Sequence, residues 1–175
     1  EGKTGTISSV KQDLSAVEVK LASLEGRTGK ISSPASKVMF TVTGVEWKGS
    51  TTVDSLAAPS ADPGTLSNGY RFKKPGDFDK SDPKKWEVSS YVWSPGAMTV
   101  LQGDEVTLRV FILNGDKHDS WIAGPDGKEA VSVQTLNRGR EYTLRFTASQ
   151  VGHYLLHCHT HAPTMDAVIT VLPRT

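Results

Sequence analysis

The stretch MTVLQGDEVTLRVFILN, residues 98–114, indicates the fold class. Apolar residues occupy every second position from Val106 to Ile112, which gives an extended strand one apolar face. A shorter apolar run, Met98–Leu101, precedes it, and Gln102-Gly103-Asp104 between the two is typical of a turn. Two strands joined by a tight turn are therefore expected, because neither run has the period of a helix.

The same short alternating runs fill the rest of the chain from about residue 37 onward. They are separated by turn signals rich in Gly, Pro and Asp, such as Gly124-Pro125-Asp126-Gly127. Further strands are expected near residues 38–47, 86–93, 121–122, 142–146, 152–158 and 167–172. This pattern predicts an all-β, antiparallel sandwich or barrel.

The N-terminal part, residues 1–35, has a different pattern and predicts a helix followed by a short linker. Its apolar residues are spaced 4, 3, 4 and 3 apart, as in a heptad seam, at Val10, Leu14, Val17, Leu21 and Leu24. A helix of two heptads is marginal alone in water. It either packs on its own domain or pairs with other copies in a small coiled coil.

Residues 36–175 are expected to form one domain, interrupted by a long insertion at about 49–85 that is rich in Pro, Gly, Ser and Asp. Loops longer than about 15 residues are uncommon in compact domains unless they have a role. This insertion is therefore interpreted as a functional excursion over one end of the sandwich or as an interface element.

Composition excludes several classes of function. The net charge of +1 gives no reason to expect nucleic acid or an anionic membrane as partner. No apolar run reaches the ~20 residues needed to span a bilayer. Glu1–Thr6 is polar, so the chain is either cytoplasmic or a mature chain whose secretion signal was removed. A single cysteine, Cys158, excludes an intramolecular disulfide.

The residues around that cysteine include several potential metal ligands. Residues 152–165 read GHYLLHCHTHAPTM. Strand alternation places Cys158 on the inward face with Tyr154 and Leu156, and His161 lies in a loop that can fold back toward the thiol. Met165 follows four residues later. Thiolate, imidazole and thioether form a donor set that suits copper.

A second histidine must come from elsewhere in the chain. His118 is the only histidine before the cluster at His153–His161. The motif is thus His118, a long interval, then Cys158-x-x-His161-x-x-x-Met165.

This arrangement closely resembles the cupredoxins, the family of plastocyanin, amicyanin and azurin, over roughly residues 86–173. The resemblance implies a Greek-key β-sandwich with one copper ion per chain. It also implies His118, Cys158 and His161 as ligands and Met165 as a weak axial ligand. No catalytic residue is implied, and the expected function is one-electron transport between redox partner proteins outside the cytoplasm, in the periplasm or at the cell exterior.

Two features leave alternatives open. His157-Cys158-His159 resembles the motif of multicopper oxidases, but residues 1–117 contain no histidine for a trinuclear cluster. His153, His157 and His159 are therefore expected at the surface, as an electron exit or as part of a weaker shared metal site.

The Cys-x-x-His start of the ligand loop also occurs in red copper proteins such as nitrosocyanin. An open copper site that reacts with a small molecule such as nitric oxide is the alternative function. The heptad seam favours a homo-oligomer, because it would expose a strip of apolar side chains if left unpaired. Likeness to nitrosocyanin and nitrite reductase assemblies favours a trimer before a dimer.

Overall fold

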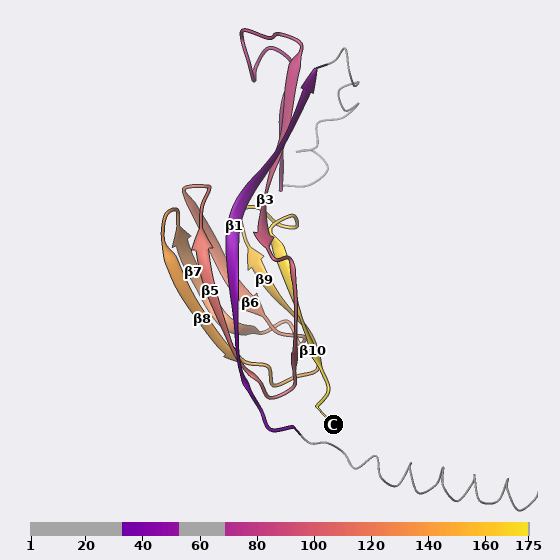
Figure 1. Ribbon diagram of the computed structural model, residues 1–175, viewed down its shortest axis with the longest axis vertical. Coiled ribbons are helices and arrows are strands. Elements are labelled where there is room, and N and C mark those ends of the chain that lie inside the picture. Colours follow the sequence, from indigo (N-terminus) through magenta and orange to yellow (C-terminus); the bar gives the residue numbers. More distant parts are fainter. Residues whose placement is uncertain (1–32, 53–68, 175) are drawn as a thin grey trace, which may run out of the picture. The chain divides into compact units, whose positions relative to one another are not determined.

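The structure is a computed structural model that describes residues 33–52 and 69–174 (Figure 1). The described residues form two five-stranded sheets, ordered β2-β3-β1-β5-β8 and β4-β10-β9-β6-β7. The strand bounds are β1 (Lys37–Thr52), β2 (Tyr70–Lys73), β3 (Lys85–Ser94), β4 (Ala97–Leu101), β5 (Glu105–Ile112), β6 (Lys117–Ala123), β7 (Glu129–Asn137), β8 (Glu141–Thr147), β9 (Gly152–Cys158) and β10 (Asp166–Leu172). The predicted all-β sandwich is confirmed. Within these residues there is no helix that could cross a membrane.

The two sheets are mixed, whereas the sequence pattern predicted antiparallel pairing throughout. Antiparallel pairs predominate, but β1 runs parallel to β5 and β10 runs parallel to β4. Parallel neighbours need a crossover connection, and in both cases several other strands separate the partners along the chain. The chain changes sheet four times between β4 and β9, which brings distant segments together.

The core lies between the sheets and contains the face predicted from the alternating pattern. The four apolar residues from Val106 to Ile112 on β5 are at most 1% exposed. Ile122, Leu156 and Ile169 of the other sheet are fully buried and belong to the same cluster. Each such side chain contributes roughly 1.5–3 kcal/mol by leaving water, so the core holds both sheets in place.

A buried carboxylate ties the two ends of the domain together away from the core. Asp104, in the turn before β5, accepts hydrogen bonds from the N–H groups of Ser36 and Leu101, each at 2.9 Å. It also forms an ion pair with Arg174 near the C-terminus. Burial alone would raise the pKa of Asp104, but these hydrogen bonds and the guanidinium outweigh it and hold the pKa below its ordinary value.

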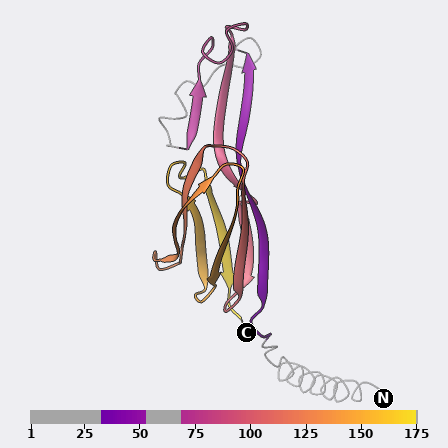
Figure 2. The same cartoon turned by 90° about the vertical axis from the view of Figure 1, so that its left-hand side faces the viewer.

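Three strands extend beyond the sandwich and form a feature that we call the arm, residues 45–52, 70–73 and 85–92 (Figure 2). Strand β1 pairs with β5 only as far as Gly44, yet it pairs with β3 as far as Thr52. Strand β2 pairs with the other edge of β3. Parts of the expected insertion at 49–85 are therefore strand. Residues 53–68, the predicted helix and its heptad seam lie outside the described residues.

Candidate metal centre

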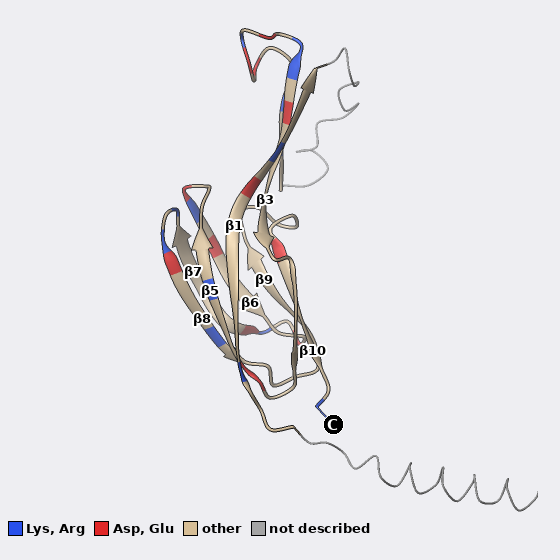
Figure 3. Ribbon diagram, viewed as in Figure 1, with Lys and Arg blue, Asp and Glu red and all other residues tan. Residues whose placement is uncertain are grey.

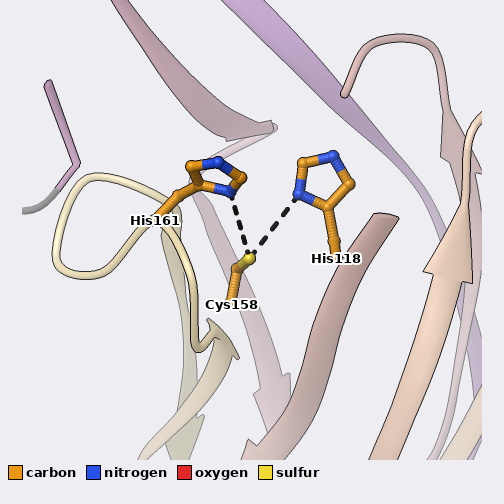
Figure 4. Close-up of side chains that lie close together, drawn as sticks. All are labelled: His118, Cys158 and His161. Atoms are coloured by element: carbon orange, nitrogen blue, oxygen red, sulfur yellow. Dashed lines mark hydrogen bonds between the residues drawn. The ribbon is translucent and has the colours of Figure 1, made fainter. Parts of the chain in front are cut away.

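Three side chains from separate segments meet at the end of the sandwich next to the arm (Figure 4). His118 comes from the start of β6, Cys158 from the end of β9, and His161 from the loop before β10. The Nδ1 atoms of His118 and His161 lie 3.6 Å and 3.5 Å from Sγ of Cys158. Among the described residues, no other group of three His, Cys, Asp or Glu side chains has such spacing. The sequence predicted that these three side chains lie close together.

The loop between β9 and β10 is shaped by its own hydrogen bonds. The N–H of Met165 donates to the carbonyl of His161 at 2.9 Å, and the N–H of Cys158 donates to the carbonyl of Met165 at 3.1 Å. The hydroxyl of Thr164 also donates to the His161 carbonyl, at 2.9 Å. These bonds turn the chain back, so that the His161 ring lies over the thiol.

The His118 ring is oriented by the segment that precedes it. Its Nε2 lies 2.8 Å from the carbonyl oxygen of Asn114. A carbonyl can only accept, so Nε2 carries the proton and Nδ1 directs its lone pair toward Cys158. Gly115 makes this approach possible, because a Cβ at that position would lie 2.6 Å from Nε2 of His118. Its φ of +76° also favours glycine.

The three groups are buried, and burial sets their protonation. His118 and Cys158 are fully buried and His161 is 6% exposed. Burial lowers the pKa of His118, and burial with help from His118 and Arg71 lowers the pKa of His161 to about 4. Both imidazoles are therefore neutral at physiological pH, the form in which they bind metals. Burial raises the pKa of the Cys158 thiol, so a bound cation is what would stabilise its thiolate.

Two aromatic residues from β3 cover the histidine rings. The Tyr91 ring lies with its centroid 4.3 Å from that of His161 and 5.2 Å from that of His118. The Trp93 ring lies 6.2 Å from His118. Both aromatics lie in the strand expected at residues 86–93, and no local pattern in the sequence links them to the site. They exclude water from most of the cluster.

Each of the two nitrogen–sulfur separations is compatible with one metal ion bound between that imidazole and the Cys158 sulfur. With metal–nitrogen and metal–sulfur bonds of about 2.0 Å and 2.3 Å, the observed N–S separations correspond to angles of roughly 109–114°. A His₂Cys set with a soft thioether nearby is typical of copper electron-transfer sites.

Met165, the predicted fourth ligand, is fully buried in the same loop. Its methyl group packs toward β1, where a Cβ on Gly44 would lie 3.2 Å from it. Its main chain closes the ligand loop, as described above. Coordination by its sulfur stays a prediction.

The other three histidines lie outside the cluster, as expected. His157 is half-buried on the outer face of its sheet, with Nδ1 2.8 Å from the Asp166 carboxylate and its ring 5.0 Å from Trp121. His153 and His159 are exposed. The structure brings none of them to the Cys158 sulfur.

No family model and no curated protein matches the sequence. Three similar solved structures are auracyanins. Auracyanin A, described as a "blue" copper protein from the green thermophilic photosynthetic bacterium Chloroflexus aurantiacus, is 18% identical over 46% of this chain and 89% of its own, with a TM-score of 0.39. Auracyanin B is 17% identical over 47% of this chain and 81% of its own, with a TM-score of 0.40.

Dithionite-reduced auracyanin from the photosynthetic bacterium Roseiflexus castenholzii is 22% identical over 47% of this chain and 88% of its own, with a TM-score of 0.37. Each of the three similarities covers less than half of this chain.

Proposed function

We propose that this chain is a mononuclear type 1 copper protein that carries single electrons between redox partner proteins. The observation that carries the proposal is the buried triangle formed by Nδ1 of His118, Sγ of Cys158 and Nδ1 of His161. Copper bound there would supply a one-electron couple between its monovalent and divalent states. Met165 is proposed as the weak axial ligand that adjusts the reduction potential.

The chain holds these donors rigidly, which is what a carrier requires. Strands β6 and β9 are hydrogen-bonded neighbours, and Ser120 on β6 pairs with Cys158 on β9. His118 and Cys158 therefore cannot move independently. A geometry that stays the same in both oxidation states keeps the reorganisation cost of electron transfer low. The near-complete burial of His161 leaves only a small exposed edge for transfer.

Copper loading tests the proposal. We expect copper(II) to bind with one ion per chain and to produce an intense visible band from the Cys158 thiolate. Cys158→Ser should abolish that band and weaken copper binding greatly, because a hydroxyl does not supply the thiolate. Zinc, which suits the same donors, gives no such band. A Cys158→Ser protein that keeps an intense visible band would contradict the assignment.

A small-molecule redox activity, for example toward nitric oxide, is the second candidate. The observation in its favour is an open recess of about 400 Å³ that reaches His161. Addition of nitric oxide to the copper-loaded protein separates the two functions. A pure carrier keeps its visible band, whereas an open or nitrosocyanin-like site changes it.

The same proposal places the protein in the periplasm or at the cell exterior, where such carriers exchange electrons with partner proteins. Assembly into a homo-oligomer, with a trimer preferred, remains part of the proposal. Light scattering on the full chain and on a chain starting near Ser36 tests that part, and a monomer at tens of micromolar would contradict it.

A further inference from the structure

The recess beside the metal centre is lined mainly by polar and charged residues. It lies between the arm and the loops that carry the ligands, and it has a volume of about 400 Å³. Its cationic side chains are Arg71, Lys117 and Arg138, and its acidic ones are Glu46 and Asp116. Figure 3 shows both signs of charge on the arm strands β1 and β3.

The arm is fixed above the ligand loop by a close contact. A Cβ on Gly69, just before β2, would overlap Oγ1 of Thr164, so the missing side chain lets the two segments touch. The hydroxyl of Ser90 donates to the carbonyl of Gly69 at 2.8 Å and holds this segment against β3. The start of β2 is therefore anchored next to His161.

This anchoring orients Arg71 toward the site. Arg71 pairs with Ser89 across the β2–β3 ladder, so their side chains share one face of the arm. Tyr91, two residues further along β3, points to that same face and covers the His161 ring. Arg71 thus lies on the face that continues the inner surface of the sandwich.

Arg71 differs from the other cations of the recess in its ionic partners. Arg138 pairs with Asp116 at 3.2 Å, and Lys117 lies 3.8 Å from Asp119. Glu46 is paired with Lys48, at 3.2 Å. In the part of the chain that the structure describes, no carboxylate pairs with Arg71. Among the described residues, the charge that Arg71 adds to the lining of the recess therefore has no carboxylate partner.

A planar guanidinium binds oxyanions through two parallel N–H groups, and these charge-assisted hydrogen bonds are among the stronger ones in proteins. Hydroxyl groups of Tyr91 and Thr160 belong to the same lining and can donate as well. The part of the His161 ring that points away from Cys158 completes this wall (Figure 4). The recess thus combines a cation that no described carboxylate pairs with, two residues with hydroxyl donors, and two acidic side chains that have cationic partners of their own.

We propose that this recess binds a small inorganic oxyanion, held by the Arg71 guanidinium beside the metal ligand His161. The anion contacts the protein and does not replace a ligand of the metal. A consequence that rests on the proposed function is that the anion stabilises the oxidised site more than the reduced one, because the oxidised site carries one more positive charge. The reduction potential should then fall with anion concentration and reach a plateau.

Calorimetric titration with sodium sulfate at constant ionic strength tests the site in metal-free and copper-loaded protein. We expect saturable binding of one sulfate per chain in both forms, with the visible band of the copper form unchanged in position. Arg71→Gln should weaken binding at least tenfold, and Arg71→Lys should weaken it less, because the charge remains while the two-pronged contact is lost. Arg71 is exposed, so both variants should fold.

The matched control is Arg145→Gln, which removes the same charge from an exposed position on β8, outside the recess. Sulfate binding should be unchanged in that variant. Absence of saturable binding, or equal losses in Arg71→Gln and Arg145→Gln, would overturn the proposal. The metal-free protein reports on anion binding alone, so the two proposals can fail separately. Sulfate binding without any copper band would refute only the copper function. A copper band without sulfate binding would refute only the anion site.

Discussion

Gly115→Ala tests whether the segment before β6 positions His118. The new Cβ would lie 2.6 Å from Nε2 and 2.9 Å from Cε1 of His118, and 3.2 Å from Cε1 of Tyr91. Contacts below 3.0 Å cannot persist, so the imidazole must move away from the carbonyl of Asn114. The 2.8 Å hydrogen bond that orients the ring would then be lost.

Gly127→Ala is the matched control, because Gly127 has a φ of +77° where Gly115 has +76°. Both substitutions carry a similar left-handed backbone penalty of about 1–2 kcal/mol. A Cβ at Gly127 has no atom within 4 Å, so only Gly115→Ala adds steric crowding. Crowding of a packed site costs about 1–3 kcal/mol, which lowers the melting temperature by a further ~2–12 °C in a chain of this size.

Thermal unfolding of the metal-free proteins measures the stability difference, and a copper titration followed by visible absorption measures the site. Loss of a hydrogen bond that orients a metal-binding histidine weakens metal affinity by about 10- to 100-fold. We expect Gly115→Ala to show that loss with an altered band and Gly127→Ala to show neither. Equal melting temperatures and equal copper spectra for the two variants would refute the role assigned to this segment.

Three further predictions follow from the same contacts. Met165→Leu keeps the core volume and should shift the visible band and the reduction potential if the sulfur is an axial ligand. Met98→Leu, at a core methionine outside the ligand loop, should leave the band and the potential unchanged. His159→Ala should leave the copper spectrum nearly as it is, while His161→Ala should change it strongly; the reverse result would reassign the ligand. Asp104→Asn should lower the free energy of unfolding by about 1–3 kcal/mol near neutral pH. The pKa of this carboxyl is lower in the folded protein, so the carboxylate stabilises the fold fully above the unfolded pKa, and this stabilisation fades as the pH falls through the folded pKa. Unfolding titrations should therefore show that the difference in free energy of unfolding between the parent protein and Asp104→Asn narrows below about pH 4.

The meeting of His118, Cys158 and His161 could be predicted because each of them carries a local signal, and their binding of a metal stays a prediction. Cys158 ends a strand with clear alternation, and His161 follows at a spacing that a short loop can close. His118 had no competitor upstream, since residues 1–117 contain no histidine. The cover over the site had no such signal. Tyr91 and Trp93 lie in a strand where aromatic residues normally indicate core, and only the pairing of β3 with β1 brings them over the imidazoles.

Strand β7, strand β2 and the outer end of β1 beyond Trp47 were missed for a different physical reason. Most of the Glu129–Asn137 strand is exposed, and only Leu136 is fully buried, so its sequence lacks the apolar alternation that marks a strand. The outer half of β1 is likewise polar or exposed, and Trp47 is 63% exposed. These segments are strands because their backbones pair with neighbours, and pairing between distant segments leaves little trace in local composition.

In the candidate metal centre, one sheet supplies the donor atoms and the other supplies their cover. All three donors of the triangle, and the loop that holds Met165, belong to the sheet that contains β6, β9 and β10. The cover comes from the other sheet, through Tyr91 and Trp93 of β3. Neither sheet alone can form a site that excludes water. Without Tyr91 and Trp93 the donor atoms would face water, and the covering sheet itself supplies none of the three donor atoms. The neutral, desolvated imidazoles thus depend on the packing of the sandwich. The arm extends the covering sheet, and its residues Glu46 and Arg71 line the recess that reaches His161.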